Sequence, residues 1–121
     1  MWLNYLLIGI FGGAGACTRA WISSFHESST LPWGTPLVNL AGCFLLGFLS
    51  GLSGSVLPES IRKPIATGFL GSLTTFSTFS LETLVLFEKQ GAWAAFWYFT
   101  PQLLLGLLLA LLGMTLGRAL G

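Results

Sequence analysis

Long apolar stretches separated by short polar segments dominate the chain. Four of them run over about residues 2–22, 33–52, 65–87 and 92–116. Each approaches the roughly 20 residues that an α-helix needs to cross the hydrocarbon core of a bilayer. The segments between them, 23–32, 53–64 and 88–91, are short. The pattern predicts an all-α membrane protein with four transmembrane helices, forming a single domain over residues 1–121.

Hydroxyl side chains interrupt the third apolar stretch. Six of the nine residues at positions 72–80 are Ser or Thr, and Gly68 and Gly71 precede them. Non-helical backbone at membrane depth is tolerated only where it is buried in protein or lines a water-filled cavity. We therefore expect the third helix to be broken mid-membrane, with unwinding near residues 71–75, and expect this segment to carry the function.

Composition agrees with a multi-pass protein of the cell membrane. Of the 121 residues, 54% are hydrophobic and 7% are charged, against roughly 25% charged residues in soluble domains. The net charge of +1 gives no indication of a nucleic-acid partner. The one histidine, His26, lies in a polar loop, and no metal-ligand cluster, phosphate-binding loop or nucleophile–base pair is present. These observations argue against an enzyme.

The positive charges are spread almost evenly over the two sides of the membrane. With four spans, both termini share a side with loop 53–64, which places Arg62, Lys63 and Arg118 together, against Arg19 and Lys89 on the other side. A clear excess of positive charge on one side normally sets the orientation in which a chain inserts into the membrane, and that excess is almost absent here. One interpretation is dual topology, in which two copies insert oppositely and pair antiparallel. The other interpretation is that five positive charges are too few to indicate the orientation of the chain.

Glycines recur at a spacing that suits close helix packing. Small-xxx-small pairs, which let helix backbones approach each other, occur in three of the apolar stretches. They are Gly9 with Gly13, Gly47 with Gly51, and Gly113 with Gly117.

Two ionisable residues and one amide inside the spans are candidates for function, because ionisable groups there are costly. Arg19 lies near the end of the first span, where its side chain either extends to the interface or has a functional role. Glu82 lies in the second half of the third span and suits a functional or gating role. Asn39 either joins two helices or lines a pore as a hydrogen-bond donor.

Phe76 and Phe79 stand at an i, i+3 spacing among the hydroxyls. A phenyl ring has a positive edge and a negative face. Edges turned into a narrow pore would attract an anion weakly, and conduction requires binding that also releases the ion. Backbone carbonyls freed by the expected break can hold a small cation.

Three stretches carry a resemblance to a known family. They are residues 12–15 followed by Arg19, residues 34–39 followed by Gly42, and the run 68–79. On these stretches the chain resembles the Fluc family of fluoride channels over nearly its full length. The resemblance implies an antiparallel, dual-topology dimer with two fluoride pores and one structural sodium ion at its centre. Such channels let fluoride leave the cytoplasm passively, which relieves its toxicity.

The resemblance also implies roles for individual residues. Phe76 and Phe79 resemble the pore phenylalanines, and Asn39 the amide that donates to the ion. The carbonyls of Gly71 and Thr74 resemble the sodium ligands, two from each subunit.

Further residues match a polar track along the pore and its mouth. The track comprises Thr75, Ser77, Ser80 and Glu82, and Tyr98 falls near the family's tyrosine in the fourth span. Arg19 resembles the basic residue near the aqueous vestibule.

The fourth span departs from the family pattern. Members often carry a serine just after the glycine that corresponds to Gly106, where this chain has Leu107. Three explanations stay open: the pore tolerates the change, Gln102 substitutes for the serine, or the chain is one partner of a heterodimer rather than a homodimer. In the third span, Leu70 and Ser72 stand where members often have Cys and Gly.

The sequence leaves two alternative functions. A small multidrug-type exporter has a similar dual-topology plan, but it needs a membrane-embedded carboxylate in the first span, where this chain has none. A non-transporting assembly subunit would show no flux alone or with any partner.

Overall fold

The computed structural model describes residues 1–25 and 31–121, and the regular structure in them is helical. Four helices are long and apolar enough to cross a membrane: α1 (Trp2–Ser24), α2 (Gly34–Gly51), a third over Glu59–Gln90, and α6 (Ala92–Leu120). The predicted four spans are confirmed. His26 lies outside the described residues.

The third span is assembled from four pieces. They are α3 (Glu59–Lys63), the π-helical η1 (Pro64–Leu70), α4 (Gly71–Leu73) and α5 (Phe76–Gln90). The predicted break is confirmed but is narrower than expected. Residues 71–73 still form a helical turn, and only Thr74 (φ −86°, ψ 151°) and Thr75 (φ −151°, ψ 118°) are extended.

The sequence pattern placed residues 59–63 in a loop, and this was wrong. Glu59 in the first turn of α3 and Arg62 and Lys63 in the last suit the helix dipole, which favours anions at the N-terminus and cations at the C-terminus. Pro64 follows and contributes no N–H to the hydrogen-bond ladder. The wider turns of η1 begin at this proline.

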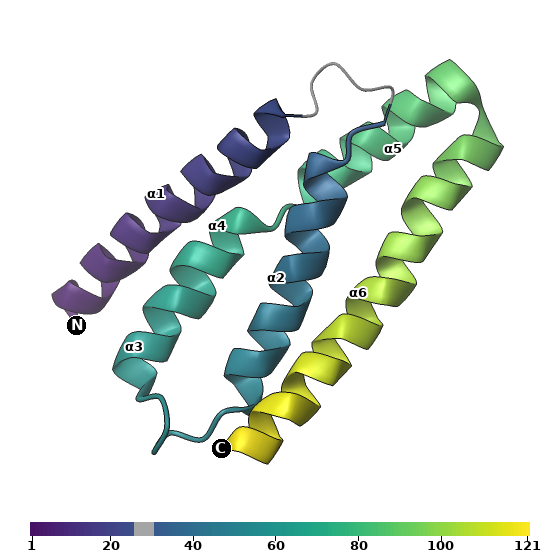
Figure 1. The fold of residues 1–121 in the computed structure, drawn as a ribbon. Helices are drawn as coiled ribbons and strands as arrows, with labels where there is room; N and C mark the ends of the chain where they lie inside the picture. Colours follow the sequence, from purple (N-terminus) through teal and green to yellow (C-terminus); the bar gives the residue numbers. More distant parts are fainter. Residues whose placement is uncertain (26–30) are drawn as a thin grey trace.

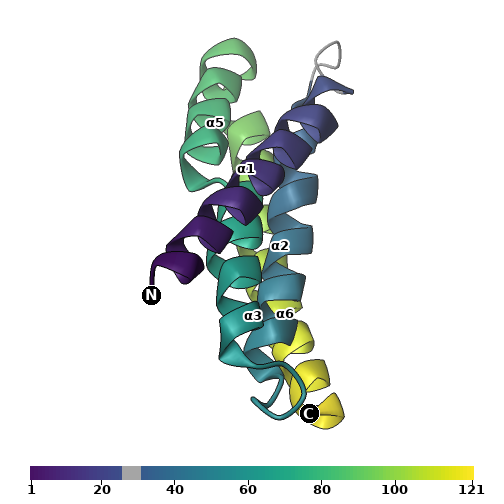
Figure 2. The ribbon, with the colours of Figure 1, turned by 90° about the vertical axis from the view of Figure 1, so that its left-hand side faces the viewer.

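The four spans alternate in direction (Figures 1 and 2). Both termini and the connection between α2 and α3 lie toward the lower end of Figure 1, whereas Gly91, at φ 94°, joins α5 to α6 at the upper end. Two closely packed pairs result, α2 with α6 and α1 with η1 and α4, while α5 packs on α6. Because the third span crosses from one pair to the other at its break, the break lies at the centre of the molecule.

Glycines set the contact between α2 and α6. A Cβ added at Gly47 or Gly51 would overlap the backbone of α6, and one added at Gly113 or Gly117 would overlap the backbone of α2. Two of the predicted small-residue pairs are therefore packing surfaces. The third pair is different, because a Cβ at Gly9 or Gly13 would meet nothing within 4 Å.

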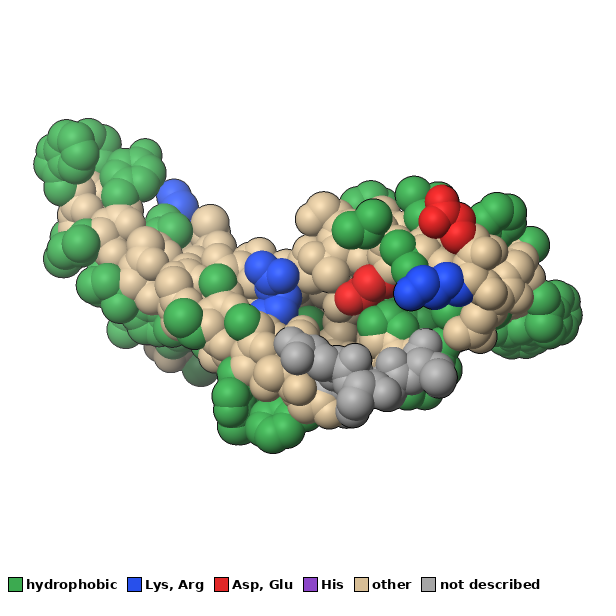
Figure 3. Space-filling model, turned by 90° about the horizontal axis from the view of Figure 1, so that it is seen from above, with side chains coloured by type: hydrophobic (Ala, Val, Ile, Leu, Met, Phe, Trp, Pro, Cys, Tyr) green, Lys and Arg blue, Asp and Glu red, His purple; other side chains and the backbone are tan. Residues whose placement is uncertain are grey.

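The buried core is small and lies on both sides of the break. Val38, Leu70 and Leu73 form one cluster, and Phe79, Leu86 and Tyr98 form the other. Most other large apolar side chains are exposed, as expected for a surface in contact with lipid. Seen from above, hydrophobic side chains cover much of the two ends of the molecule, with a hollow between them (Figure 3).

Candidate functional site

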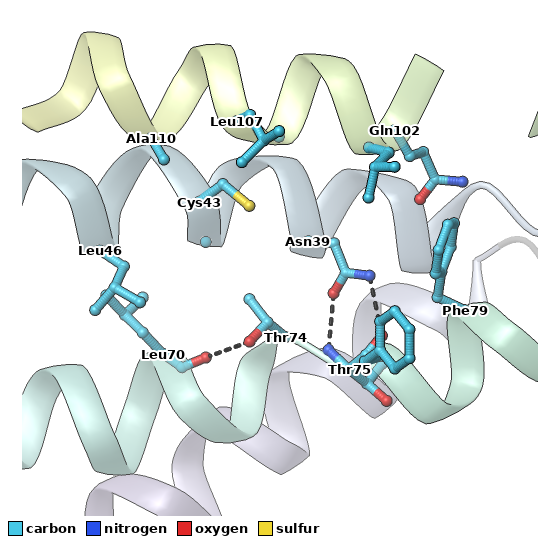
Figure 4. A pocket seen from close by; sticks show the side chains of 14 residues that line it. Asn39, Cys43, Leu46, Leu70, Thr74, Thr75, Phe79, Gln102, Leu107 and Ala110 are labelled. Atoms are coloured by element: carbon cyan, nitrogen blue, oxygen red, sulfur yellow. Dashed lines mark hydrogen bonds between the residues drawn. The ribbon is translucent and has the colours of Figure 1, made fainter. Parts of the chain in front are cut away.

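The break in the third span is held by one side chain of α2. Asn39 Oδ1 accepts a hydrogen bond from the Thr75 backbone N–H at 2.8 Å, and Asn39 Nδ2 donates to the Thr75 carbonyl at 3.0 Å (Figure 4). The amide thus replaces both backbone partners that Thr75 would have in a continuous helix. Because these groups lie at membrane depth, leaving them unpaired would be costly. Asn39 therefore joins α2 to the break.

A second group of bonds starts α5 after the break. Thr75 is the N-cap residue, and its hydroxyl accepts from the Thr78 N–H at 3.2 Å. Thr78 Oγ1 lies 3.1 Å and Ser77 Oγ 3.3 Å from the same oxygen. Ser80 donates to the Phe76 carbonyl one turn back, at 2.9 Å. The Thr75 hydroxyl thus caps α5, the second half-helix, by accepting from a backbone N–H in its first turn, and the neighbouring hydroxyls add further hydrogen bonds there.

Two carbonyls lose their helical donors as a result. In a continuous helix the N–H of residue 75 would donate to the Gly71 carbonyl, and that of residue 78 to the Thr74 carbonyl. Here the first N–H donates to Asn39 and the second to the Thr75 hydroxyl. The two carbonyls predicted to bind a cation are therefore among those that lose their regular helical donors at the break.

Arg19 lies at the end of the first half-helix. Its Nε donates to the Ser72 carbonyl at 3.1 Å, across the contact between α1 and α4. The last carbonyls of a helix carry partial negative charge, which a guanidinium complements. Arg19 is partly buried here, and its guanidinium stabilises the end of the first half-helix; its place near an aqueous vestibule stays a prediction.

The two phenylalanines have different surroundings. Phe76 is 73% exposed, whereas Phe79 is 5% exposed. Their ring centroids lie 6.1 Å apart at an angle of 50°. The Phe79 ring also stacks on Phe99 at 5.2 Å and packs against Tyr98 at 5.9 Å. One ring is thus fixed against α6, and the other is mostly exposed in the single chain.

Glu82 connects three helices. One carboxylate oxygen accepts from Thr35 Oγ1 at 2.9 Å, and the other accepts from the Tyr98 hydroxyl at 2.5 Å. Hydrogen bonds to a carboxylate are short and strong. The cluster therefore fastens α5 to α2 and α6 directly behind Phe79. Thr35 had no role in the sequence-based prediction, although its i, i+4 spacing from Asn39 places both on one face of α2.

A groove of about 350 Å³ opens beside the break (Figure 4). Asn39, Thr75, Phe76 and Phe79 line it, as does Thr74. Its α6 wall contains Leu107, the residue that departs from the family pattern, together with Gln102, Leu103, Gly106 and Ala110.

The other residues that the sequence predicted to be functional do not line this groove. Glu82 and Tyr98 form the cluster behind Phe79, Ser77 and Ser80 follow α5 away from the break, and Arg19 and Gly71 lie on its α1 side. Gln102 and Thr78 are functional candidates that the sequence did not single out firmly. Thr78 had a usable signal, its i, i+3 spacing from Thr75.

Comparison with known proteins gives the relationship of the chain. A family model described as CrcB-like protein, Camphor Resistance (CrcB), matches residues 6–114. The chain belongs to the CrcB-like family. A relative from Bordetella petrii, named fluoride-specific ion channel FluC, is 44% identical over 124 residues, which cover 98% of this chain and 94% of the relative.

Other CrcB-like relatives carry the same kind of name. A FluC 1 protein from Bacillus cereus is 43% identical over 120 residues, covering 95% of this chain and 88% of the relative. A FluC protein from Hydrogenobaculum is 40% identical over 122 residues, covering 98% and 100%. The sequence-based resemblance is confirmed. These relatives give no support to the multidrug-type exporter.

Proposed function

We propose that this chain is a fluoride-selective channel of the cell membrane that exports fluoride passively from the cytoplasm and relieves its toxicity. The observation that carries the proposal is the near full-length similarity to proteins named fluoride-specific ion channels, combined with a groove lined by Asn39, Phe76 and Phe79 at a mid-span break. The function is transport of an ion and not catalysis.

The chemistry of the groove suits a small anion. Phenyl edges carry partial positive charge, and Asn39 has a second Nδ2–H beyond the one that it donates to Thr75. Neither group is a full charge, so the ion is attracted without being trapped, which conduction requires. Arg19 and the hydroxyls of Thr75, Ser77 and Ser80 supply further polar groups near this path in our proposal.

The second subunit completes the pore in this proposal. Phe76 is 73% exposed in the protomer, and the groove beside it is open, which is unfavourable for an ion path through a bilayer. An antiparallel second copy covers the groove and brings its own phenylalanines toward it. The even distribution of charge permits both orientations. A homodimer is the simplest assembly, and a related chain that supplies a more polar fourth span is the alternative.

A structural sodium ion fits the carbonyls at the break. Gly71 and Thr74 present oxygens whose regular donors are diverted to Asn39 and Thr75, and hard cations prefer oxygen ligands. Two carbonyls from each antiparallel subunit would hold the ion. When bound, the cation would add positive charge near the anion path and would connect the break of one subunit to that of the other.

The test is fluoride efflux from liposomes that contain this chain alone. A fluoride electrode follows release, with valinomycin and potassium to clamp the voltage, and a chloride electrode runs in parallel. Fluoride release without chloride release supports a selective homodimeric channel. Absence of release from folded, dimeric protein contradicts the homodimer, and co-reconstitution with a second family member then decides between a heterodimer and a non-conducting subunit.

A further inference from the structure

A second cavity lies between α2 and the start of the third span. Its volume is about 410 Å³, within the roughly 300–1,000 Å³ that is usual for small-molecule pockets. It lies near the connection between α2 and α3 at the lower end of Figure 1. Three charged side chains of α3 line it, Glu59, Arg62 and Lys63. None of them has a part in the ion path proposed above.

The length of α2 indicates the depth of this cavity in a bilayer. Its 18 residues, Gly34–Gly51, rise about 27 Å at 1.5 Å per residue, which is close to the roughly 30 Å of the hydrocarbon core. The end of α2 therefore lies at the boundary between the acyl chains and the headgroups. Ser50 lines the cavity at this end, so the cavity opens where lipid headgroups lie.

The lining of the cavity combines an apolar and a polar part. Leu46 and Leu49 precede Ser50 along α2 and so lie on the hydrocarbon side of it, and Ala66 of η1 adds a further apolar side chain. The polar part consists of the charged residues of α3 and the hydroxyls of Ser50 and Thr67. Acyl chains suit the first part and a phosphate diester suits the second, as in basic pockets between transmembrane helices that bind lipid headgroups.

Arg62 is held beside the cavity by the backbone of the neighbouring connection. Its Nη1 donates to the Leu52 carbonyl at 3.0 Å, and its side chain is half-buried. A guanidinium has several N–H donors in a rigid fork that matches a phosphate, so donors remain for a ligand. Lys63, which is exposed, adds a second positive charge, and Glu59 adds one negative charge. The three side chains together therefore carry a net charge of +1.

We propose that this cavity binds an anionic phospholipid whose headgroup carries hydroxyls, such as phosphatidylglycerol. The lipid phosphate accepts from Arg62 and Lys63, and a headgroup hydroxyl donates to Glu59. The first acyl carbons lie over Leu46 and Leu49. The net positive charge of the lining favours an anionic lipid over a zwitterionic one. Because Leu46 also lines the groove beside the break, the lipid lies at the edge of the face that the second copy covers in the proposed dimer.

Binding of defined lipids to the delipidated full-length chain in detergent tests this site. Native mass spectrometry counts dioleoyl-phosphatidylglycerol per chain, with dioleoyl-phosphatidylcholine as the zwitterionic comparison. Lys63→Gln is expected to weaken phosphatidylglycerol binding about fivefold, and Arg62→Gln with Lys63→Gln roughly 25-fold. Lys63→Gln keeps the bond between Arg62 and Leu52, so it tests the site even if the double variant fails to fold. Lys89→Gln, at an exposed position near the end of α5, is the matched control and is expected to bind like the wild type.

Three results would each overturn the inference. The first is equal phosphatidylglycerol affinity in Lys63→Gln and the wild type, or equal affinity of the wild type for the two lipids. The second is displacement by soluble glycerol 3-phosphate as effective as by the lipid, since the site would then bind free phosphate esters. The third is a structure of the protein in lipid in which a side chain of the second copy fills the cavity. These measurements report lipid occupancy, so they are independent of whether the chain conducts fluoride.

Discussion

Asn39 and Thr75 exchange two hydrogen bonds across 36 positions of sequence, at 2.8 and 3.0 Å. A side-chain amide has the same donor and acceptor pair as a peptide group, so Asn39 completes the backbone where the helix is interrupted. The two roles considered from the sequence, joining helices and donating to an ion, are compatible. One Nδ2–H is used at the break, and the other remains for the groove.

Asn39→Asp tests the double role. The carboxylate still accepts from the Thr75 N–H, but its other oxygen faces the Thr75 carbonyl without a proton between them. We expect a loss of about 1–3 kcal/mol in stability and a strong loss of fluoride efflux, because a negative charge in the groove repels the anion. Thermal unfolding in detergent and liposome efflux measure the two effects.

Asn4→Asp, at an exposed position of α1, adds the same charge far from the break and serves as the control. Undiminished efflux in Asn39→Asp would remove Asn39 from the ion path.

Phe76 is exposed and Phe79 is buried, so substitutions at the two positions can distinguish an effect on stability from an effect on conduction. Phe76→Ile removes a ring that is mostly exposed in the protomer, so its effect on protomer stability is expected to stay within about 0.5 kcal/mol. Phe79→Ile removes stacking on Phe99 and contact with Tyr98 and is expected to cost about 1–3 kcal/mol. Both are expected to lower efflux at least tenfold, because both lose the positive ring edge.

The comparison is made with Phe87→Ile, an exposed ring on the same helix, by efflux and by unfolding of detergent-solubilised protein. If either Phe76→Ile or Phe79→Ile conducts normally, the role of that ring is reduced to packing.

The length of the apolar stretches predicted the four spans, and the dense hydroxyls predicted the break, because both are local properties of the chain. The i, i+3 spacing of Phe76 and Phe79 could not predict that one ring is exposed and the other buried. That difference arises because Tyr98 and Phe99 of α6 cover only one of them. The pairing of Asn39 with Thr75 was also hidden, since it depends on how α2 meets the third span.

The two hydrogen bonds that Glu82 accepts from Thr35 and Tyr98 are expected to contribute to the stability of the folded protein. Thr35→Val preserves shape at a buried position and leaves one carboxylate oxygen without its donor. We expect a cost of about 1–3 kcal/mol, and the cost should shrink in the Glu82→Gln background, as a double-mutant cycle of unfolding free energies would show. Thr115→Val, an exposed hydroxyl bonded to its own helix, is expected to be nearly neutral. Equal costs of Thr35→Val in both backgrounds would mean that the two residues are not coupled.

Because α2 packs closely on α6, replacing a glycine by alanine is expected to destabilise the protein at Gly113 but not at Gly13. Gly113→Ala places a methyl group into the backbone of Phe44 and is expected to cost at least about 1–3 kcal/mol or to prevent folding. Gly13→Ala meets nothing within 4 Å, and alanine is favoured in helices by up to about 1 kcal/mol. The unfolding temperature should fall for the first variant and hold or rise for the second. A similar fall for both would contradict the packing described here.

Sodium removal tests the carbonyls of Gly71 and Thr74. Gly71 is exposed and Thr74 is half-buried in the single chain. In the proposed dimer, two breaks that face each other would bury these carbonyls, which is costly without donors, and would bring their oxygens together, with mutual repulsion unless a cation lies between them. We therefore expect that exchanging sodium for N-methylglucamine during reconstitution weakens the dimer and lowers efflux, and that sodium restores both whereas the larger potassium ion does not. Mass photometry in detergent measures the dimer, and the fluoride electrode measures efflux. Dimers that persist and conduct after exhaustive sodium removal would show that another group, such as a donor from the second subunit, satisfies these oxygens.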